Sequence, residues 1–402
     1  MSLNKKTLQS IEPAGKRVFV RVDFNVPLTD LSPDGQRAVS DDTRIQAALP
    51  TLRFLLEAGA AVIVASHLGR PKGEVKEELR MSPVAAHLAT LLNGFVVHAA
   101  DDTIGPDAQA KVSALKPGEL LLLENLRFDA GEKSGDSAFS AALAQYADIY
   151  VNDAFGTCHR AHASMAGVPA LVKPAVAGLL LEKEIHAFDA VLGNGKRPVV
   201  AIIGGAKVSD KIVILENLLP KVDAVLIGGG MAYTFLAAQG IAIGDSLLEQ
   251  ERIETAKAIL VKANELGVDL LLPTDHIAAD RFAADAQTQV VEGGIPDGYM
   301  GLDIGPVTQA QFATRAAAAG TVVWNGPMGV FEMPAFAGGT LTIAQALADS
   351  DCTSVIGGGD SVAAIKQNGL ADQVTHISTG GGAFLEMLEG KTLPGFAALD
   401  DN

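Results

Sequence analysis

Polar and charged residues that could bind an anion follow the short aliphatic runs in the first half of the sequence. They are Asp23, Asn25, His67, Arg70, Arg127 and Arg160, together with Arg44 in the first turn of a helical segment that opens at Asp41. Arginine binds phosphate or carboxylate through two parallel hydrogen bonds. A single arginine of this kind is usually a solvated surface charge, but four of them are better explained by one shared anion site.

A thiol nucleophile is the alternative interpretation of the same region, because Cys158 stands next to His159. No orienting motif accompanies this pair. We therefore expect anion binding here, without nucleophilic catalysis.

Glycine-rich segments follow the aliphatic runs of the second half. They are Gly204-Gly205-Ala206-Lys207, Gly228-Gly229-Gly230, Gly357-Gly358-Gly359-Asp360-Ser361 and Gly380-Gly381-Gly382. Glycine lets the backbone approach a ligand closely, and amides at a helix N-terminus bind phosphate oxygens. Tight turns between strands and helices also use glycine, so any one of these segments alone is weak support for a ligand.

Charged residues beside these glycines favour a nucleotide. We expect Lys207 and Lys211 to lie one helical turn apart and to face a phosphate. Asp360 could bind Mg²⁺, and Glu332 could reach a ribose hydroxyl.

Two series of elements must position these residues. Short β-branched or aliphatic runs alternate with segments of helical periodicity; the runs are residues 18–22, 61–65, 120–123, 148–151, 199–203, 224–227, 270–272, 321–324 and 354–356. Such alternation predicts an α/β protein with two doubly wound, Rossmann-like parallel-sheet domains, and ligands bind at the carboxyl ends of parallel strands.

A helical segment separates the two series. Leu181, Ile185, Phe188 and Leu192 recur at helical spacing, and Gly193-Asn194-Gly195 is expected to end the helix. We therefore predict an N-terminal domain over residues 1–175, a hinge helix over 176–195 and a C-terminal domain over 196–389.

The composition limits the partners. The 402 residues include 31 Lys and Arg against 47 Asp and Glu, a net charge of −16, and so acidic a chain is not expected to bind nucleic acid or anionic lipid. Residues 224–244 form an uncharged stretch long enough to span a bilayer, but five glycines interrupt it. Two cysteines and no visible signal segment lead us to expect a cytoplasmic protein.

Missing motifs narrow the class further. The sequence has no Gly-x-x-x-x-Gly-Lys-Ser/Thr loop, and no Gly-x-Gly-x-x-Gly opens the first helix of either half. Two alternatives remain open: a nicotinamide dehydrogenase on a similar frame, and a non-catalytic two-lobed protein that binds an anion or a nucleotide.

Taken together, the motifs resemble the phosphoglycerate kinase family from end to end. The matching segments are residues 21–27 (RVDFNVP), 66–71 (SHLGRP), 124–128 (ENLRF), 152–157 (NDAFGT), 159–162 (HRAH), 204–208 (GGAKV), 228–231 (GGGM), 324–327 (WNGP), 329–332 (GVFE), 358–361 (GGDS) and 378–382 (STGGG). The sequence departs from the usual pattern in a longer loop over residues 28–40, in Cys158 in place of alanine, and in Phe384 in place of a small residue.

The resemblance implies a monomer whose N-terminal lobe binds 3-phosphoglycerate or 1,3-bisphosphoglycerate and whose C-terminal lobe binds ADP or ATP with Mg²⁺. It implies that the glycerate is held by Asp23, Asn25, Arg44, His67, Arg70, Arg127 and Arg160. It implies that the nucleotide is held by Lys207, Lys211, Gly301, Glu332, Gly358, Gly359, Asp360 and Ser361. Residues from about 390 to 402 are expected to return to the N-terminal lobe.

The resembling activity is reversible phosphoryl transfer between 1,3-bisphosphoglycerate and ADP, which requires two oxygens in line and neutralised charge on the moving group. We assign Arg44, Lys211 and the backbone amides of Gly358 and Gly359 to that group, with Mg²⁺ held by Asp360. We expect no general base, because the acceptor carboxylate is already ionised at neutral pH. Closure of the hinge is expected to complete the site and to exclude water.

Overall fold

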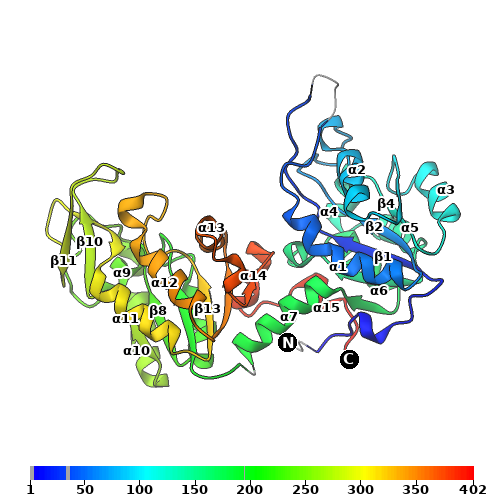
Figure 1. Cartoon of the computed structure of the whole chain (residues 1–402). Coiled ribbons are helices and arrows are strands. Elements are labelled where there is room, and N and C mark those ends of the chain that lie inside the picture. The colour runs from blue at the N-terminus through cyan, green and yellow to red at the C-terminus, as the bar shows by residue number, and fades with distance from the viewer. Residues whose placement is uncertain (1–3, 33–36, 194) are drawn as a thin grey trace. The chain divides into compact units, whose positions relative to one another are not determined.

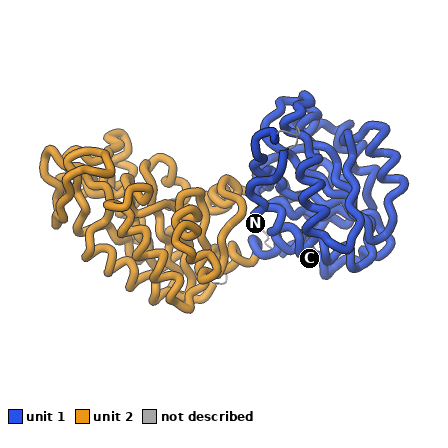
Figure 2. The backbone as a smooth tube through the Cα atoms, turned by 45° about the horizontal axis from the view of Figure 1, so that its top comes forward, with its two compact units in different colours: residues 1–185, 392–402 blue, residues 186–391 orange. Residues whose placement is uncertain are grey.

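The computed structural model describes residues 4–32, 37–193 and 195–402. Asn194, in the expected helix stop, and residues 33–36, in the loop over 28–40, lie outside the described residues. The chain divides into two compact units, one of Met1–Ile185 with Thr392–Asn402 and one of His186–Lys391 (Figure 2). The division falls within helix α7 (Leu179–Leu192).

The first unit is built on a six-stranded parallel sheet in the order β3-β4-β2-β1-β5-β6 (Figure 1). Its strands are β1 (Arg17–Val22), β2 (Ala61–Ala65), β3 (Val96–Ala99), β4 (Glu119–Leu122), β5 (Ile149–Asp153) and β6 (Ala175–Ala177). Its helices besides α7 are α1 (Thr43–Glu57), α2 (Ser82–Leu91), α3 (Pro106–Ala114), α4 (Ala130–Ser134), α5 (Ser137–Ala144), α6 (Val168–Leu171) and α15 (Pro394–Ala397). The central strands β1, β2 and β5 are almost entirely buried, as expected for parallel strands covered on both faces.

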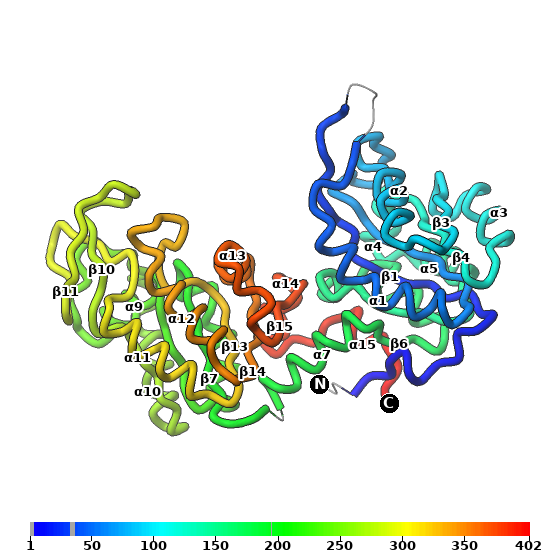
Figure 3. Tube along the Cα trace, viewed as in Figure 1, coloured from blue at the N-terminus to red at the C-terminus, as the bar shows by residue number. Residues whose placement is uncertain are grey.

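The C-terminal segment belongs to the first unit. Lys6 donates its backbone N–H to the carbonyl of Asp400 at 2.9 Å, and Asn152 donates its side-chain amide to the carbonyl of Gly395 at 2.9 Å. Figure 3 shows this segment, in red, beside the blue N-terminal segment and β6. Gly395 also donates its backbone N–H to the carbonyl of Cys158 at 2.9 Å, so the chain returns to β5 and to the loop that follows it.

The second unit contains another six-stranded parallel sheet, in the order β15-β14-β13-β7-β8-β9. Its strands are β7 (Val199–Ile203), β8 (Ala224–Ile227), β9 (Asp269–Leu271), β13 (Thr321–Asn325), β14 (Thr353–Gly357) and β15 (His376–Ile377). Its helices are α8 (Ile212–Leu218), α9 (Met231–Ala238), α10 (Ile253–Leu266), α11 (Pro306–Ala317), α12 (Gly338–Ala348), α13 (Gly359–Gln367) and α14 (Gly381–Leu388). The two parallel sheets confirm the predicted fold class.

A three-stranded antiparallel sheet, which the sequence did not predict, completes the second unit. Its order is β11-β10-β12, with β10 (Asp275–Ala279), β11 (Thr288–Glu292) and β12 (Met300–Ile304). The outer strand β11 is mostly exposed, so it lacks the continuous apolar run by which the central strands of the two parallel sheets were recognised. The short strands β3, β6 and β15 were not predicted either.

No helix in the described part of the chain is both long enough and apolar enough to cross a membrane. The uncharged stretch over residues 224–244 contains strand β8, a glycine turn and helix α9. The interpretation of that stretch as a strand, a turn and the start of a helix is therefore confirmed.

Candidate active site

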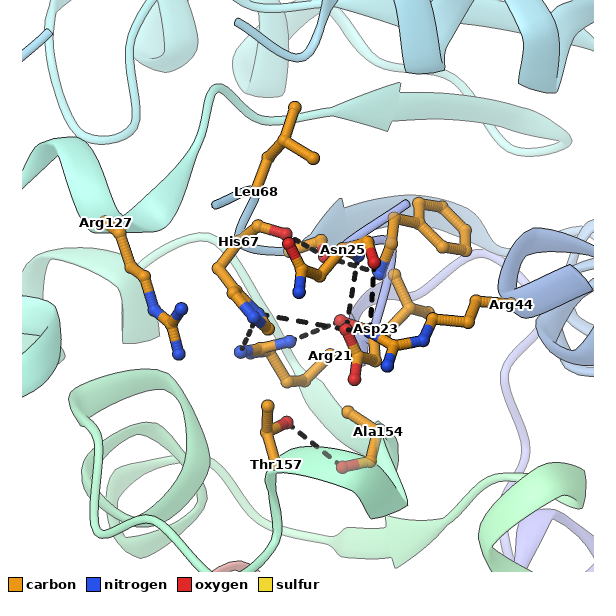
Figure 4. Close-up of polar contacts among 12 residues, drawn as sticks. Arg21, Asp23, Asn25, Arg44, His67, Leu68, Arg127, Ala154 and Thr157 are labelled. Atoms are coloured by element: carbon orange, nitrogen blue, oxygen red, sulfur yellow. Dashed lines mark hydrogen bonds and ion pairs between the residues drawn. The ribbon is translucent and has the colours of Figure 1, made fainter. Parts of the chain in front are cut away.

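The predicted anion-binding residues of the first unit gather at the carboxyl ends of β1, β2, β4 and β5. These four strands are parallel and lie side by side in the sheet, so the residues that follow them meet at one edge. Figure 4 shows His67, Asp23, Asn25, Arg44 and Arg127 in one close-up of this edge. The sheet therefore brings together residues that are up to 137 positions apart in the sequence (23 to 160).

Asp23 and Asn25 anchor the loop after β1. Arg44 donates from Nη1 to the carboxylate of Asp23 at 3.2 Å and to the carbonyl of Asn25 at 3.0 Å. The side-chain oxygen of Asn25 accepts the backbone N–H of Gly69, in the loop after β2, at 2.8 Å. The Arg44 side chain is 42% exposed, so much of its guanidinium remains available to a ligand.

Arg127 lies on the other side of the β2 loop. It donates from Nη1 to the carbonyl of Gly69 at 2.9 Å, while Asn125 accepts the backbone N–H of both Arg127 and Leu68. Burial lowers the pKa of Arg127, and the charge of Arg21 lowers it further. A guanidinium that is partly desolvated in this way gains more from an anionic ligand than a solvated one does.

Arg70 and Arg160 are exposed in the loops after β2 and β5. Within the described part of the chain, neither side chain forms a hydrogen bond or an ion pair that would occupy it. Both are thus available to a ligand from solvent.

His67 is the buried member of the set, with 3% of its surface exposed. Burial lowers its pKa well below the ordinary value, and the charges of Arg21, Arg127 and Arg44 lower it further. The neighbouring His162 is similar: burial and the charges of Arg127 and Arg21 lower its pKa to about 4. Both histidines are therefore neutral at pH 7.

Cys158 is fully buried, and burial raises the pKa of its thiol to about 12. A thiol that stays protonated and inaccessible is a poor nucleophile. This agrees with the expectation that nucleophilic catalysis plays no part here.

The second unit has a cleft of about 650 Å³ beside its glycine-rich loops. Three of the predicted nucleotide-binding residues line it: Gly301, Glu332 and Asp360. Glycines of two strand-end loops, Gly205 and Gly229, form part of its wall.

The wall of the cleft has room only for a glycine at position 301. A Cβ atom on it would lie 2.0 Å from the hydroxyl oxygen of Tyr233, which is buried beneath it.

Lys211, Gly358, Gly359 and Ser361 lie around Asn325 at the end of β13. Lys211 donates a short hydrogen bond to the side-chain oxygen of Asn325, whose amide donates to the carbonyl of Gly357 at 2.8 Å. Ser361 is fully buried and accepts the backbone N–H of Gly326 at 2.7 Å. Gly358 has φ +92°, and Gly359 begins helix α13, so the loop leads directly into a helix N-terminus that can bind anions.

Lys211 is half-buried. Burial lowers its pKa, whereas the carboxylates of Asp210, Asp360 and Glu389 act in the opposite direction. The expected helical turn between Lys207 and Lys211 is wrong, because this segment is a series of turns and α8 begins only at Ile212. Lys207 is exposed on that segment and does not line the cleft.

Sequence reasoning missed the apolar part of the cleft. Its apolar lining includes Leu247, Phe282, Met300, Leu302, Val330 and Met333. These residues come from separate loops and from β12, and no local pattern marked them. Arg21 was also missed as a separate site residue, although a lone arginine inside a strand that is otherwise aliphatic was a visible signal.

The cleft fits a magnesium ion that arrives with a nucleotide. Asp360 is exposed and lines the cleft. Among the described residues, no group of three or more His, Cys, Asp and Glu could hold a metal ion by itself. One carboxylate supplemented by phosphate oxygens is the usual protein environment of Mg²⁺.

The fold and the two sites together define a class: an α/β protein with a cluster of cationic side chains at the edge of one parallel sheet and a glycine-rich cleft in the unit built on the other. The model of the family described as phosphoglycerate kinase matches residues 8–391. The chain therefore belongs to the phosphoglycerate kinase family, whose members are phosphotransferases with a carboxyl group as acceptor.

Curated relatives and solved structures agree with this assignment. The chain is 54% identical to the phosphoglycerate kinase of Synechococcus elongatus, over 99% of this chain and 100% of the relative, and 56% identical to that of Herpetosiphon aurantiacus with the same coverage. It superposes on the structure of phosphoglycerate kinase from Coxiella burnetii with a TM-score of 0.90, 43% identity and 98% coverage of both chains. The comparisons favour the kinase over the non-catalytic binding protein and over the dehydrogenase.

Proposed function

We propose that this protein transfers a phosphoryl group reversibly between 1,3-bisphosphoglycerate and MgADP, giving 3-phosphoglycerate and MgATP, as a cytoplasmic monomer in glycolysis and gluconeogenesis. One observation carries the proposal. Each unit has, at the carboxyl edge of its parallel sheet, a site suited to one of the two substrates: cations for a phosphorylated acid, and glycine turns with an apolar wall for a nucleotide.

On the glycerate side, the exposed guanidinium groups of Arg44, Arg70 and Arg160 bind the phosphate and carboxylate oxygens, with Arg127 beside them. Asp23 and Asn25 orient this set through their contacts to Arg44 and Gly69. The unpaired state of Arg70 and Arg160 within the described chain supports this role, because an anion would supply their missing partners.

On the nucleotide side, the base occupies the apolar part of the cleft and Glu332 accepts a hydrogen bond from a ribose hydroxyl. Asp360 would hold Mg²⁺, which neutralises charge on the nucleotide phosphates when bound. The phosphates are bound by the N-terminus of α13 at Gly359 and by the side chains of Lys207 and Lys211. Ser361 contributes indirectly: its buried hydroxyl accepts the backbone N–H of Gly326 and so fixes the loop beside the phosphates.

During transfer, Arg44 and Lys211 stabilise charge on the moving phosphoryl group, assisted by the amides of Gly358 and Gly359. The attacking oxygen needs no base, since a carboxylate or a nucleotide phosphate is already ionised. We propose that residues 176–195 act as the hinge that lets both units reach one phosphoryl group. Small-angle scattering with and without both substrates tests this, and a profile unchanged by substrates would contradict it.

The activity itself is tested by ATP formation from ADP, Mg²⁺ and enzymatically generated 1,3-bisphosphoglycerate. The Lys211→Ala variant should lose most of this turnover, while Lys257→Ala, which removes an exposed lysine paired with Glu254, serves as the matched control. Chelation of Mg²⁺ should abolish turnover and re-addition should restore it. Tight MgADP binding by calorimetry without any turnover would refute the kinase and favour a binding protein.

A further inference from the structure

Arg21 is an arginine held without solvent contact inside the first unit. It lies in β1, and its side chain is 0% exposed. Its Nε donates to the hydroxyl of Ser164 at 2.8 Å, and its Nη1 donates a short hydrogen bond to the carbonyl of Val22. Neighbouring groups therefore hold two of the three guanidinium nitrogens, Nε and Nη1, in place.

A buried carboxylate balances this charge. Glu132, also 0% exposed, lies 3.9 Å from Nη2 of Arg21. Its two oxygens accept the backbone N–H of Ser164 at 2.9 Å and the Ser164 hydroxyl at 2.6 Å. A buried ion pair is stable only when further hydrogen bonds satisfy the two charged groups. The hydrogen bonds of Arg21 to Ser164 and Val22, together with Glu132, therefore fix the direction of its guanidinium plane.

The third nitrogen, Nη2, is 3.4 Å from Nδ1 of His67 (Figure 4). Guanidinium has only donors, so the ring nitrogen in this contact must accept. Nδ1 therefore carries no proton, and in a neutral imidazole the proton then resides on Nε2.

Asp23 does not compete for a proton on Nδ1. Its nearer oxygen lies 4.0 Å from Nδ1 of His67, beyond hydrogen-bond distance. The same oxygen already accepts from Arg44 and from the backbone N–H of Asn25, each at 3.2 Å.

The other ring nitrogen is available. Within the described part of the chain, no hydrogen bond to Nε2 of His67 is formed. This nitrogen is not one of the fully buried polar atoms that lack a partner, so the small exposed part of the ring leaves its N–H open to a ligand at the anion site.

We propose that Arg21 is a positioning residue that fixes His67 as the neutral tautomer with its proton on Nε2, so that His67 offers a hydrogen-bond donor to an anionic oxygen of the glycerate substrate. The substrate part of this inference rests on the proposed function; the tautomer does not. The charged groups around His67 agree with it: Arg21 from β1, Arg44 from α1 and Arg127 after β4 disfavour a second proton. The carboxylate of Asp23, 4.0 Å from Nδ1, acts in the opposite direction. The neighbouring His162 is neutral at pH 7.

The first test measures the tautomer directly on the unmodified enzyme without substrate. Nitrogen-15 NMR of histidine-labelled protein distinguishes a protonated from an unprotonated ring nitrogen, and His67→Gln identifies the resonances. We expect a protonated Nε2 and an unprotonated Nδ1 at pH 7. A proton on Nδ1, or a doubly protonated ring at pH 7, would overturn the proposal.

The second test asks whether Arg21 causes this state. In Arg21→Met, the pKa of His67 should rise toward its ordinary range, whereas Arg17→Met, an exposed arginine of the same strand paired with Asp148, should leave it unchanged. If Arg21→Met alone does not fold because Glu132 is left unpaired, the double variant Arg21→Met/Glu132→Gln replaces it. An unchanged His67 titration in the folded variant would refute the role of Arg21.

Kinetics then connect the tautomer to the substrate. The amide nitrogen of glutamine can occupy the place of Nε2, and that of asparagine can occupy the place of Nδ1. We expect His67→Asn to raise the KM for 3-phosphoglycerate by about tenfold more than His67→Gln does, with the KM for ATP unchanged in both.

The pH dependence supplies a readout that a purely structural role would not change. We compare the KM for 3-phosphoglycerate of Arg21→Met with that of the wild type as a ratio, in which the substrate's own titration cancels. This ratio should fall as the pH decreases below about 6.5. In the variant His67 then gains a positive charge, which strengthens its binding to the anionic substrate. A flat ratio would contradict the proposal. Absence of turnover in the wild type, with the tautomer as expected, would refute the proposed function alone.

Discussion

Gly358 is the residue whose replacement should separate loop geometry from simple destabilisation. It links β14 to α13 with φ +92° and ψ 139°. A Cβ atom placed there would lie 2.5 Å from the side-chain amide nitrogen of Asn325. Since Asn325 also holds Lys211 and the carbonyl of Gly357, Gly358→Ala should displace the group that positions Lys211, to which we assign stabilisation of the moving phosphoryl group.

The expected cost has two parts. A non-glycine residue in such a backbone region costs on the order of 1–3 kcal/mol, and loss of the Asn325 hydrogen bond to Gly357 costs about 1 kcal/mol more. A total of about 3 kcal/mol corresponds to a decrease in Tm of about 6–12 °C for a unit of this size. A displaced Lys211 should lower kcat on the order of 10²-fold, as is typical when one preorganised charge-stabilising group is lost.

The assay is ATP formation with both substrates saturating, alongside thermal unfolding. Gly369→Ala is the matched control: Gly369 also has positive φ (+67°), follows the same helix and has nothing within 4 Å of its Cβ position. It should lose about 1–2 kcal/mol of stability from backbone strain and keep its kcat. Equal losses of kcat in the two variants, or a wild-type kcat in folded Gly358→Ala, would refute the argument that Asn325 transmits the change.

Three further predictions concern other parts of the structure. Arg44→Ala should lower kcat by on the order of 10²-fold or more with nucleotide affinity almost unchanged, because among the described residues Arg44 forms hydrogen bonds to Asp23 and Asn25 of the first unit and is 42% exposed; near wild-type turnover would refute its assignment. Gly301→Ala should raise the KM for ATP without changing that for 3-phosphoglycerate, since its Cβ atom would meet the Tyr233 hydroxyl beside the cleft; steady-state kinetics with each substrate varied will show whether only one KM responds. Burial raises the pKa of Asp153 to about 7, above its ordinary 3.8, so the folded protein binds this proton more tightly than the unfolded chain. The contribution of this group to the free energy of unfolding therefore falls as pH rises from about 4 to about 7, by up to about 1.4 kcal/mol per pH unit. Asp153→Asn, which keeps the oxygen that accepts the N–H groups of Leu180 and Leu181, should flatten that slope in urea unfolding, and a slope as steep as that of the wild type would count against the raised pKa.

Much of the anion site could be predicted because it depends on a rule that links sequence to space. Residues that directly follow parallel strands meet at one sheet edge, so recognising the four runs was sufficient to group Asp23, His67, Arg127 and Arg160. The nucleotide cleft was less predictable. Its glycines were visible in the sequence, but its apolar wall combines side chains from β12 and from loops tens of residues apart.

Local pattern also failed where a segment has no regular structure. Lys207 and Lys211 have the spacing of a helical turn, yet the chain there forms turns, and Lys211 is directed by Asn325, more than a hundred residues later. Hydrogen-bond partners so distant in the sequence leave no local signal.

The sequence by itself determined the α/β alternation, the two sets of strand-end residues and their chemistry, because apolar periodicity and residue type are local properties that packing preserves. Only the tertiary structure decided the lowered pKa of His67, the raised pKa of Asp153, the partner of Lys211 and the role that we propose for Arg21. Each of these depends on desolvation and on the direction of a neighbouring charge, and both are set by contacts between residues that the chain keeps far apart until it folds.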